Sequence, residues 1–125
     1  MQRITVMTMS EHDEQTKLFE WARYREGKYP ELALMFAIPN GGHRHITVAK
    51  RMKAEGVKAG VPDVLLPVMR GGYHSLWIEL KHGKNKATDS QQWWLDMLNA
   101  EGHKAVIAYE FEGARDAVLE YLDAQ

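Results

Sequence analysis

The chain has 125 residues, of which 45% are hydrophobic and 26% charged, and it has a formal net charge of −1 and no cysteine. This composition predicts one globular domain over residues 1–125 and excludes low-complexity disorder, disulfides and thiolate zinc sites. No signal sequence and no apolar run long enough for a membrane span is present, so we expect a cytoplasmic protein with no membrane partner.

The first half of the chain predicts a helix, a strand and a second helix. Ser10 as N-cap, acids in the first turn and apolar residues at helical spacing predict a helix over Glu11–Arg25. Pro30 ends that pattern, the apolar run Leu32–Ile38 suits a strand, and "PNGG" at 39–42 indicates a turn. "ITVAKRMKAEGVKAG" at 46–60 predicts a helix with a basic exposed face, terminated by its glycines.

The second half predicts a hairpin followed by helix, strand and helix. Val64–Met69 and Ser75–Leu80 flank "RGGYH", and Pro67 suggests an edge or a bulge. A helix follows from Thr88 to Gly102, then the apolar strand "KAVIAYE" at 104–110 and the amphipathic helix "GARDAVLEYLDA" at 113–124. The order α-β-α-β-β-α-β-α predicts an α/β fold with a mixed sheet flanked by helices.

Two carboxylates and a lysine stand at strand ends. If the hairpin strands pair, Asp63 and Glu79 lie at the same end, and Glu79 and Lys81 point to the same side of the sheet. Adjacent carboxylates are costly unless a cation neutralises them, and their oxygens suit Mg²⁺. Such an ion can activate water and stabilise charge on a phosphodiester, with Lys81 orienting the water or screening charge. The simpler interpretations are a turn residue at Asp63 and a surface ion pair of Glu79 with Lys81.

These residues carry a family resemblance. Pro62-Asp63 followed by Glu79-x-Lys81 resembles the signature of PD-(D/E)xK nucleases. "EGVKAGVPDVLLPV", the hairpin ending in "IELK" and "TDSQQ" before a helix more closely resemble the VRR-NUC family, especially its stand-alone bacterial and phage members. "SEHDEQTKLFEWA", "IPNGG" and the closing strand and helix match in order, so the resemblance spans nearly the whole chain. The short strings recur by chance, whereas their combination is specific.

The resemblance implies the PD-(D/E)xK nuclease fold, dependence on Mg²⁺ or Mn²⁺, and cleavage of phosphodiesters in structured DNA. By match to the family pattern, Asp63 and Glu79 ligate metal and Lys81 acts at the attacking water. A first-helix glutamate completes the acidic site; "E-x-x-x-Q" assigns it to Glu11, with Glu14 as the alternative.

The same resemblance gives Gln91 a place in the catalytic site. It would contact metal-bound water or DNA, although a capping role is an equally good interpretation. Thr88 stands where the motif has Ser, which preserves the capping hydroxyl.

Two stretches, 43–58 and 81–86, are rich in basic residues, whereas the chain from Glu110 onward is mainly acidic. One face could therefore meet phosphates, although solvated helix faces explain the same pattern. The candidate DNA-binding residues are Arg44, Lys50, Arg51, Lys53, Lys84 and Lys86, together with Asn40, whose glycine-rich turn would allow close approach of DNA or simply reverse the chain.

The histidines and tryptophans have simpler interpretations. No HExxH pattern or cysteine accompanies His43, His45, His74 or His82, so we expect solvated or phosphate-contacting histidines rather than zinc ligands. The pair at 93–94 could stack on bases, but at least one tryptophan is expected in the core or an interface.

The interpretation that joins these features is a structure-selective endonuclease acting on branched DNA. Two coordinated cuts across a symmetric four-way junction would suit a homodimer with one complete site per subunit. The alternative is a non-catalytic DNA-binding or assembly module, and the joint presence of Asp63, Glu79 and Lys81 argues against it. A restriction nuclease would need a recognition domain that this sequence does not show.

Overall fold

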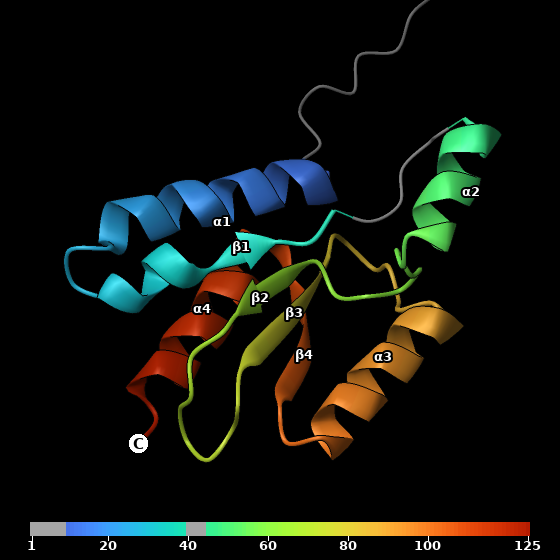
Figure 1. The fold of residues 1–125 in the computed structure, drawn as a ribbon. Coiled ribbons are helices and arrows are strands. Elements are labelled where there is room, and N and C mark those ends of the chain that lie inside the picture. The colour runs from blue at the N-terminus through green and yellow to red at the C-terminus, as the bar shows by residue number, and fades with distance from the viewer. Residues whose placement is uncertain (1–9, 40–44) are drawn as a thin grey trace, which may run out of the picture.

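The computed structural model describes residues 10–39 and 45–125. The elements follow in the order α1 (Glu11–Arg25), the 3-10 helix η1 (Pro30–Leu34), β1 (Phe36–Ala37), α2 (Ile46–Ala54), β2 (Val64–Leu66), β3 (Leu76–Lys81), α3 (Asp89–Ala100), β4 (Lys104–Tyr109) and α4 (Glu110–Asp123). The predicted succession of helices and strands is confirmed, with η1 as an addition (Figure 1).

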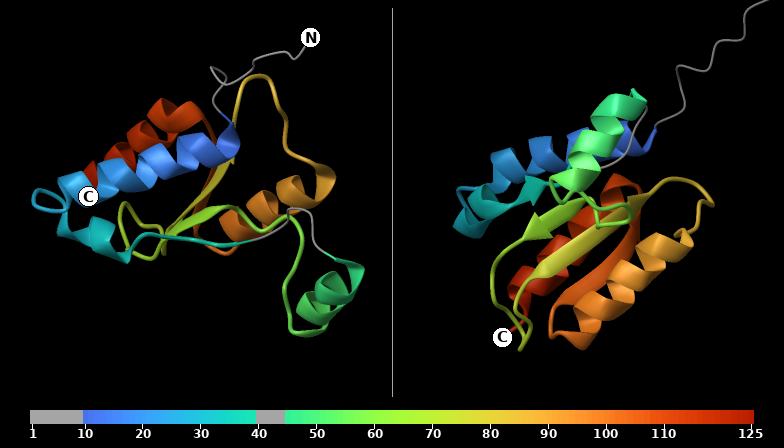
Figure 2. Two further views of the ribbon diagram at one scale, coloured as in Figure 1. Left: turned by 90° about the horizontal axis from the view of Figure 1, so that it is seen from above. Right: turned by 45° about the vertical axis from the view of Figure 1, so that its right-hand side comes forward.

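A mixed sheet occupies the centre of the fold, in the order β1-β2-β3-β4. β1 pairs with β2 and β2 with β3 in antiparallel fashion, whereas β3 and β4 are parallel. Helices α1 and α4 lie side by side on one face of the sheet, and α3 packs against β4 from the other side (Figure 2). The central strand β3 packs against α1 and α4 and reaches α3 through the Lys81–Gln91 hydrogen bond, and its residues form a nearly continuous buried run.

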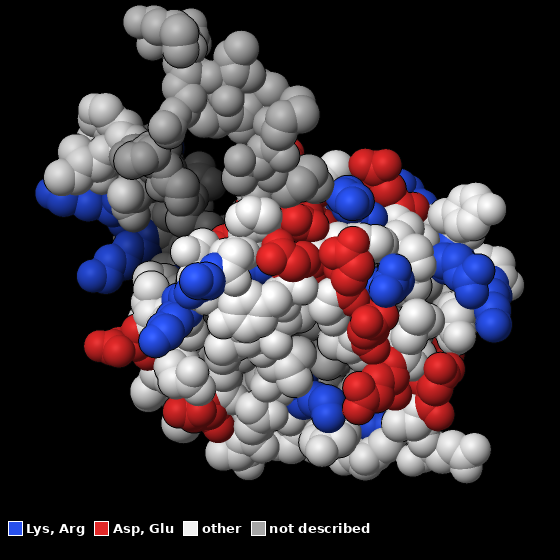
Figure 3. All heavy atoms as spheres, turned by 180° about the vertical axis from the view of Figure 1, so that it is seen from behind, with Lys and Arg blue, Asp and Glu red and all other residues white. Residues whose placement is uncertain are grey.

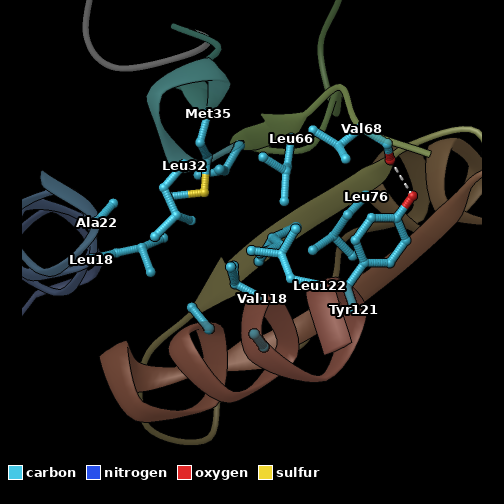
Figure 4. Close-up of a cluster of buried hydrophobic side chains, with 14 of the residues drawn as sticks. Leu18, Ala22, Leu32, Met35, Leu66, Val68, Leu76, Val118, Tyr121 and Leu122 are labelled. Atoms are coloured by element: carbon cyan, nitrogen blue, oxygen red, sulfur yellow. Dashed lines mark hydrogen bonds between the residues drawn. The ribbon is translucent and has the colours of Figure 1, made fainter. Parts of the chain in front are cut away.

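The hydrophobic core lies between the sheet and the α1/α4 pair (Figure 4). Leu18 of α1 and Val118 of α4 meet Leu76 and Ile78 of β3 there, all of them fully buried. Tyr121 completes this layer, and its hydroxyl donates a hydrogen bond to the carbonyl oxygen of Val68. The core thus fixes both helices against the strand that carries Glu79 and Lys81.

Local sequence signals correctly predicted the ends of α1 and the C-terminal end of α2. α1 has the predicted bounds and a capping box, in which the Asp13 amide donates to Ser10 Oγ and the Ser10 amide donates to Asp13 Oδ2. α2 ends at Ala54, two residues before Gly56, whose φ of 98° allows the chain to leave the helix.

Three element bounds differ from the prediction. The strand expected over Leu32–Ile38 is wrong in its first part: Pro30 starts η1, and Leu32 and Met35 turn inward three residues apart, so only Phe36–Ala37 form a strand. The strand expected to reach Met69 ends at Leu66, because Pro67 has no amide hydrogen to donate.

The last helix also begins earlier than predicted, at Glu110 instead of Gly113. Glu110 has a φ of 61°, and this left-handed residue turns the chain directly from β4 into α4. The Phe111 amide at that helix start donates to the Glu14 carboxylate of α1, 2.8 Å away. A glutamate distant in the sequence therefore replaces the local cap that the sequence pattern requires.

Helix α2 stands away from the rest of the fold (Figure 2). None of its residues is buried, and Lys50, Arg51 and Lys53 are exposed, which confirms its predicted basic exposed face. The helices of the described residues include none with the length and apolar character needed to cross a membrane.

Candidate active site

The hairpin brings Asp63 and Glu79 to the same end of the sheet, as predicted. Val64 pairs with Ile78, so the residue before Val64 stands opposite Glu79 in the antiparallel register. The Asp63 backbone accepts a hydrogen bond from the Ile38 amide at 2.8 Å, and its carboxylate accepts one from the Leu80 amide at 2.8 Å. Asp63 is thus held by β1 on one side and by β3 on the other.

Glu79 and Lys81 project from β3 into a buried environment. The Glu79 residue is 2% exposed and Lys81 6%. Lys81 Nζ lies 3.7 Å from Glu79 Oε2 and donates a 2.8 Å hydrogen bond to Gln91 Oε1 of α3. The interpretation of this pair as an exposed surface ion pair is therefore wrong, because burial removes the solvent screening that makes such pairs weak.

The acidic pair is electrostatically unfavourable as it stands. Burial, together with the neighbouring Asp63 charge, raises the pKa of Glu79 to about 8, although Lys81 opposes the shift. Burial likewise raises the pKa of Asp63, against the lowering effect of its hydrogen bond from Leu80. Glu79 Oε1 is inaccessible to solvent and has no hydrogen-bond partner. A divalent cation fits this donor set, because it would occupy the unpartnered oxygen and neutralise the paired carboxylates.

Of the two first-helix glutamates, Glu11 is the one that acts on this pair. Its charge raises the pKa of both Asp63 and Glu79. Glu11 Oε2 accepts a hydrogen bond from Asn85 Nδ2 at 3.0 Å, in the segment between β3 and α3. Glu14, one turn further along α1, instead faces His82. The geometry thus favours Glu11 over Glu14 as the third carboxylate.

Gln91 has the capping role that the sequence offered, and it also contacts Lys81. The Gln91 backbone amide donates a hydrogen bond to Thr88 Oγ1 at 3.2 Å, and the side-chain Oε1 of Gln91 accepts one from the Thr88 backbone amide at 2.9 Å. These two bonds form the predicted capping box. The same Oε1 accepts the bond from Lys81. The start of α3 therefore positions the lysine ammonium beside Glu79.

Comparison with known proteins agrees with this geometry. The sequence model of the VRR-NUC domain matches residues 2–111. The chain belongs to the VRR-NUC family. A solved structure described as a "VRR_NUC domain protein" is 31% identical, with a TM-score of 0.79, and the alignment covers 92% of this chain and 89% of that chain. Comparison with curated proteins finds no significant match. The mixed sheet flanked by helices is accordingly the PD-(D/E)xK-like fold of a nuclease-family domain.

A close approach of backbones, which the sequence did not predict, positions the "GVPD" segment of this VRR-NUC fold. A Cβ atom on Gly60 would lie 2.8 Å from the Ser90 carbonyl carbon, so no larger residue fits there, and the φ of 91° also favours glycine. Trp94 Nε1 donates to the Ala59 carbonyl oxygen at 3.1 Å. Of the adjacent pair Trp93 and Trp94, Trp94 thus has a structural role, whereas Trp93 is 55% exposed.

The predicted DNA-binding residues flank this end of the VRR-NUC fold. α2 and the β3–α3 segment with Lys84 and Lys86 both lie beyond the carboxyl end of β3 (Figure 1), and both lysines are exposed. Asn40 and Arg44 lie outside the described residues. The face seen from behind the view of Figure 1 carries a band of acidic side chains, with lysines and arginines around it (Figure 3). The exposed acids of α4 line one side of that helix: Glu112, Asp116, Glu120 and Asp123.

The sequence did not predict the contact between His82 and Glu110, which lies near the candidate site. His82 Nδ1 lies 2.7 Å from Glu110 Oε2, although 28 positions separate these residues in the sequence. Alternation along β3 would have placed His82 on the side opposite Lys81, but only the fold brings Glu110 to it. Three other described histidines have structural contacts: His45 caps α2, and the rings of His74 and His103 pack edge to face.

Proposed function

We propose that this VRR-NUC protein is a divalent-metal-dependent, structure-selective endonuclease that hydrolyses phosphodiester bonds in branched DNA. The observation that carries the proposal is the convergence of half-buried Asp63 with buried Glu79 and Lys81, in which one Glu79 oxygen has no partner. A purely structural cluster would be expected to satisfy that oxygen, because an unpaired buried acceptor costs about 1–3 kcal/mol.

The residues have distinct roles in this proposal. Asp63, Glu79 and Glu11 would hold Mg²⁺ or Mn²⁺, which supplies activation of water and stabilisation of charge on the phosphate. Lys81, fixed by its bond to Gln91 Oε1, would orient the attacking water and offset negative charge at the phosphoryl oxygens. Gln91 is then a positioning residue that acts through Lys81.

DNA would approach from the carboxyl end of β3. Five exposed basic residues lie on elements other than the acidic helix α4. They are Lys50, Arg51 and Lys53 on the projecting helix α2, and Lys84 and Lys86 beyond β3. We extend this surface to Asn40 and Arg44 from the sequence pattern. Such a divided basic surface suits DNA with more than one arm better than a straight duplex.

A four-way junction is the branched substrate that we favour. Its two symmetric cuts require two active sites in fixed relation, so we propose that the protein acts as a homodimer with one complete site in each subunit. Light scattering during gel filtration would measure the mass of the particle in solution, and a monomeric mass with and without junction DNA would refute the dimer.

The activity is tested by incubating purified protein with labelled duplex, flap and four-way-junction DNA in the presence of Mg²⁺, Mn²⁺ or EDTA. We expect metal-dependent cleavage that is strongest on the junction or flap. Asp63→Asn, purified in parallel, is the matched control because it keeps the side-chain shape and removes a ligand charge. Cleavage undiminished in EDTA, or equal cleavage by Asp63→Asn, would refute the proposed site. Equal cleavage of duplex and branched DNA would refute the selectivity alone.

A further inference from the structure

A second cluster of potential ligands lies on the other side of the active-site strand. Glu14 of α1, His82 just after β3 and Glu110 at the start of α4 each direct one ligand atom to a common point, and these atoms lie within 4.8 Å of one another. His82 Nδ1 is 3.3 Å from Glu14 Oε2 and 2.7 Å from Glu110 Oε2. None of these three residues belongs to the Asp63, Glu79 and Glu11 set.

The hydrogen bonds around this cluster leave the facing atoms available. Glu14 Oε1 accepts from the Phe111 amide at 2.8 Å, and Glu110 Oε1 accepts from the Gly83 amide at 3.1 Å. Each glutamate is therefore anchored through one oxygen, with the other turned toward His82 Nδ1. Both His82 Nδ1 and Glu110 Oε2 are buried from solvent, yet neither makes an aligned hydrogen bond. The short contact between them is thus not explained by an ordinary hydrogen bond.

The mixture of donors identifies the class of ligand. We propose that Glu14, His82 and Glu110 bind a divalent transition-type cation, of which Zn²⁺ is the test ion. One imidazole nitrogen and two carboxylate oxygens form a set that suits Zn²⁺, with ligand distances of about 2.0–2.2 Å, whereas Mg²⁺ prefers oxygen donors and retains water. The two carboxylates also match the ion's double positive charge when the imidazole is neutral. The ligand atoms are buried, but the His82 and Glu110 side chains as a whole are 28% and 36% exposed, so the cluster lies just beneath the surface.

This ion would add a further link between three elements that already meet through the Phe111–Glu14 and Gly83–Glu110 hydrogen bonds. Glu14 belongs to α1, His82 follows β3, and Glu110 begins α4, the helix that lies beside α1 (Figure 2). Glu11 is one turn from Glu14 on the same helix. A bound ion would therefore stabilise the fold at the end that carries the proposed catalytic carboxylates, without itself contacting DNA or the scissile phosphate.

Calorimetric titration of EDTA-treated, desalted protein with Zn²⁺ in the presence of excess Mg²⁺ tests this site separately from nuclease activity. The Asp63→Asn variant serves as the background because it weakens the candidate catalytic metal site. We expect one Zn²⁺ per chain in this background, with binding at least about tenfold weaker after a further His82→Gln or Glu110→Gln change. Zn²⁺ should also raise the melting temperature of the Asp63→Asn protein but not of the two double variants.

Each outcome of this titration bears on the proposal. No Zn²⁺ binding in the Asp63→Asn background, or unchanged affinity after both further substitutions, would overturn it. Circular dichroism checks that each variant is folded. If His82→Gln fails to fold, Glu110→Gln is decisive, because its side chain is partly exposed and its amide oxygen can still accept from the Gly83 amide. X-ray absorption of the Zn²⁺-loaded Asp63→Asn protein should show one nitrogen donor from imidazole among oxygen donors.

Discussion

The buried Glu79 carboxyl should make the stability of the metal-free protein depend on pH in an unusual direction. Burial and the Asp63 charge raise the pKa of Glu79 to about 8 in the folded state, whereas an unfolded glutamate titrates near 4.5. Between these values the folded protein keeps a proton that the unfolded chain has released. The free energy of unfolding should therefore fall as the pH rises through this window and level off above it.

The size of this effect follows from the same two pKa values. At full difference in protonation, the loss is about 1.4 kcal/mol for each pH unit. From about pH 5 to about pH 8, integration gives a loss of roughly 3 kcal/mol from this one group. That is a large share of the typical stability of a domain, about 5–15 kcal/mol. Glu79→Gln removes the titrating group and should abolish this contribution.

Urea unfolding of wild type and Glu79→Gln, in EDTA across this pH range, measures the effect. The difference between the two proteins reports Glu79 together with its effect on the neighbouring Asp63 carboxyl, because all other titrating groups are present in both. Mg²⁺ bound beside the carboxylate would favour its charged form, so millimolar Mg²⁺ should flatten the wild-type profile and leave that of Glu79→Gln unchanged. Parallel pH profiles for the two proteins in EDTA would refute the buried, raised-pKa carboxyl.

Three further predictions concern the separate parts of the site. Glu11→Gln should abolish cleavage, whereas Glu14→Ala should retain it while lowering the free energy of unfolding by about 1–3 kcal/mol, since the Phe111 amide loses its acceptor; loss of cleavage only on mutation of Glu14 would move the ligand role there. Lys81→Met should lower the single-turnover rate roughly a hundredfold with a much smaller effect on DNA affinity, and a near-normal rate would remove Lys81 from the mechanism. Replacing Lys50, Arg51 and Lys53 with Ala should weaken DNA binding and reduce its salt-dependence slope by roughly three, about one for each lost phosphate contact; unchanged affinity and slope would place α2 away from DNA.

Local sequence signals were sufficient where a helix end depends on neighbouring residues. The capping boxes of α1 and α3, begun by Ser10 and Thr88, fixed the starts of both helices. The hairpin signal likewise predicted that Asp63 and Glu79 share one end of the sheet. It did not predict their pairing, because the Arg70–Tyr73 bridge at the Gly-Gly turn and the Val64–Ile78 pair differ by one residue in register.

Prediction failed where long-range contacts replace local ones. The start of α4 at Glu110 has no side-chain cap of its own, and its Phe111 amide is satisfied by Glu14, 97 positions earlier. The His82 cluster has the same origin, since its members come from three separate elements. The apolar run before Ile38 failed for another reason: a 3-10 turn beginning with Pro30 buries residues three apart, which a continuous apolar stretch does not distinguish from a strand.

The charges at the candidate active site argue for a single divalent ion in the absence of DNA. With Glu79 in the charged form that a bound cation favours, Asp63, Glu79 and Glu11 contribute three negative charges and Lys81 one positive charge, which leaves a net charge of −2. One Mg²⁺ neutralises this set, whereas a second would leave an excess positive charge in a buried site. The phosphate of bound DNA adds a negative charge and could balance further cation density. We therefore expect one ion per site in the free protein, and any second ion to bind only together with DNA.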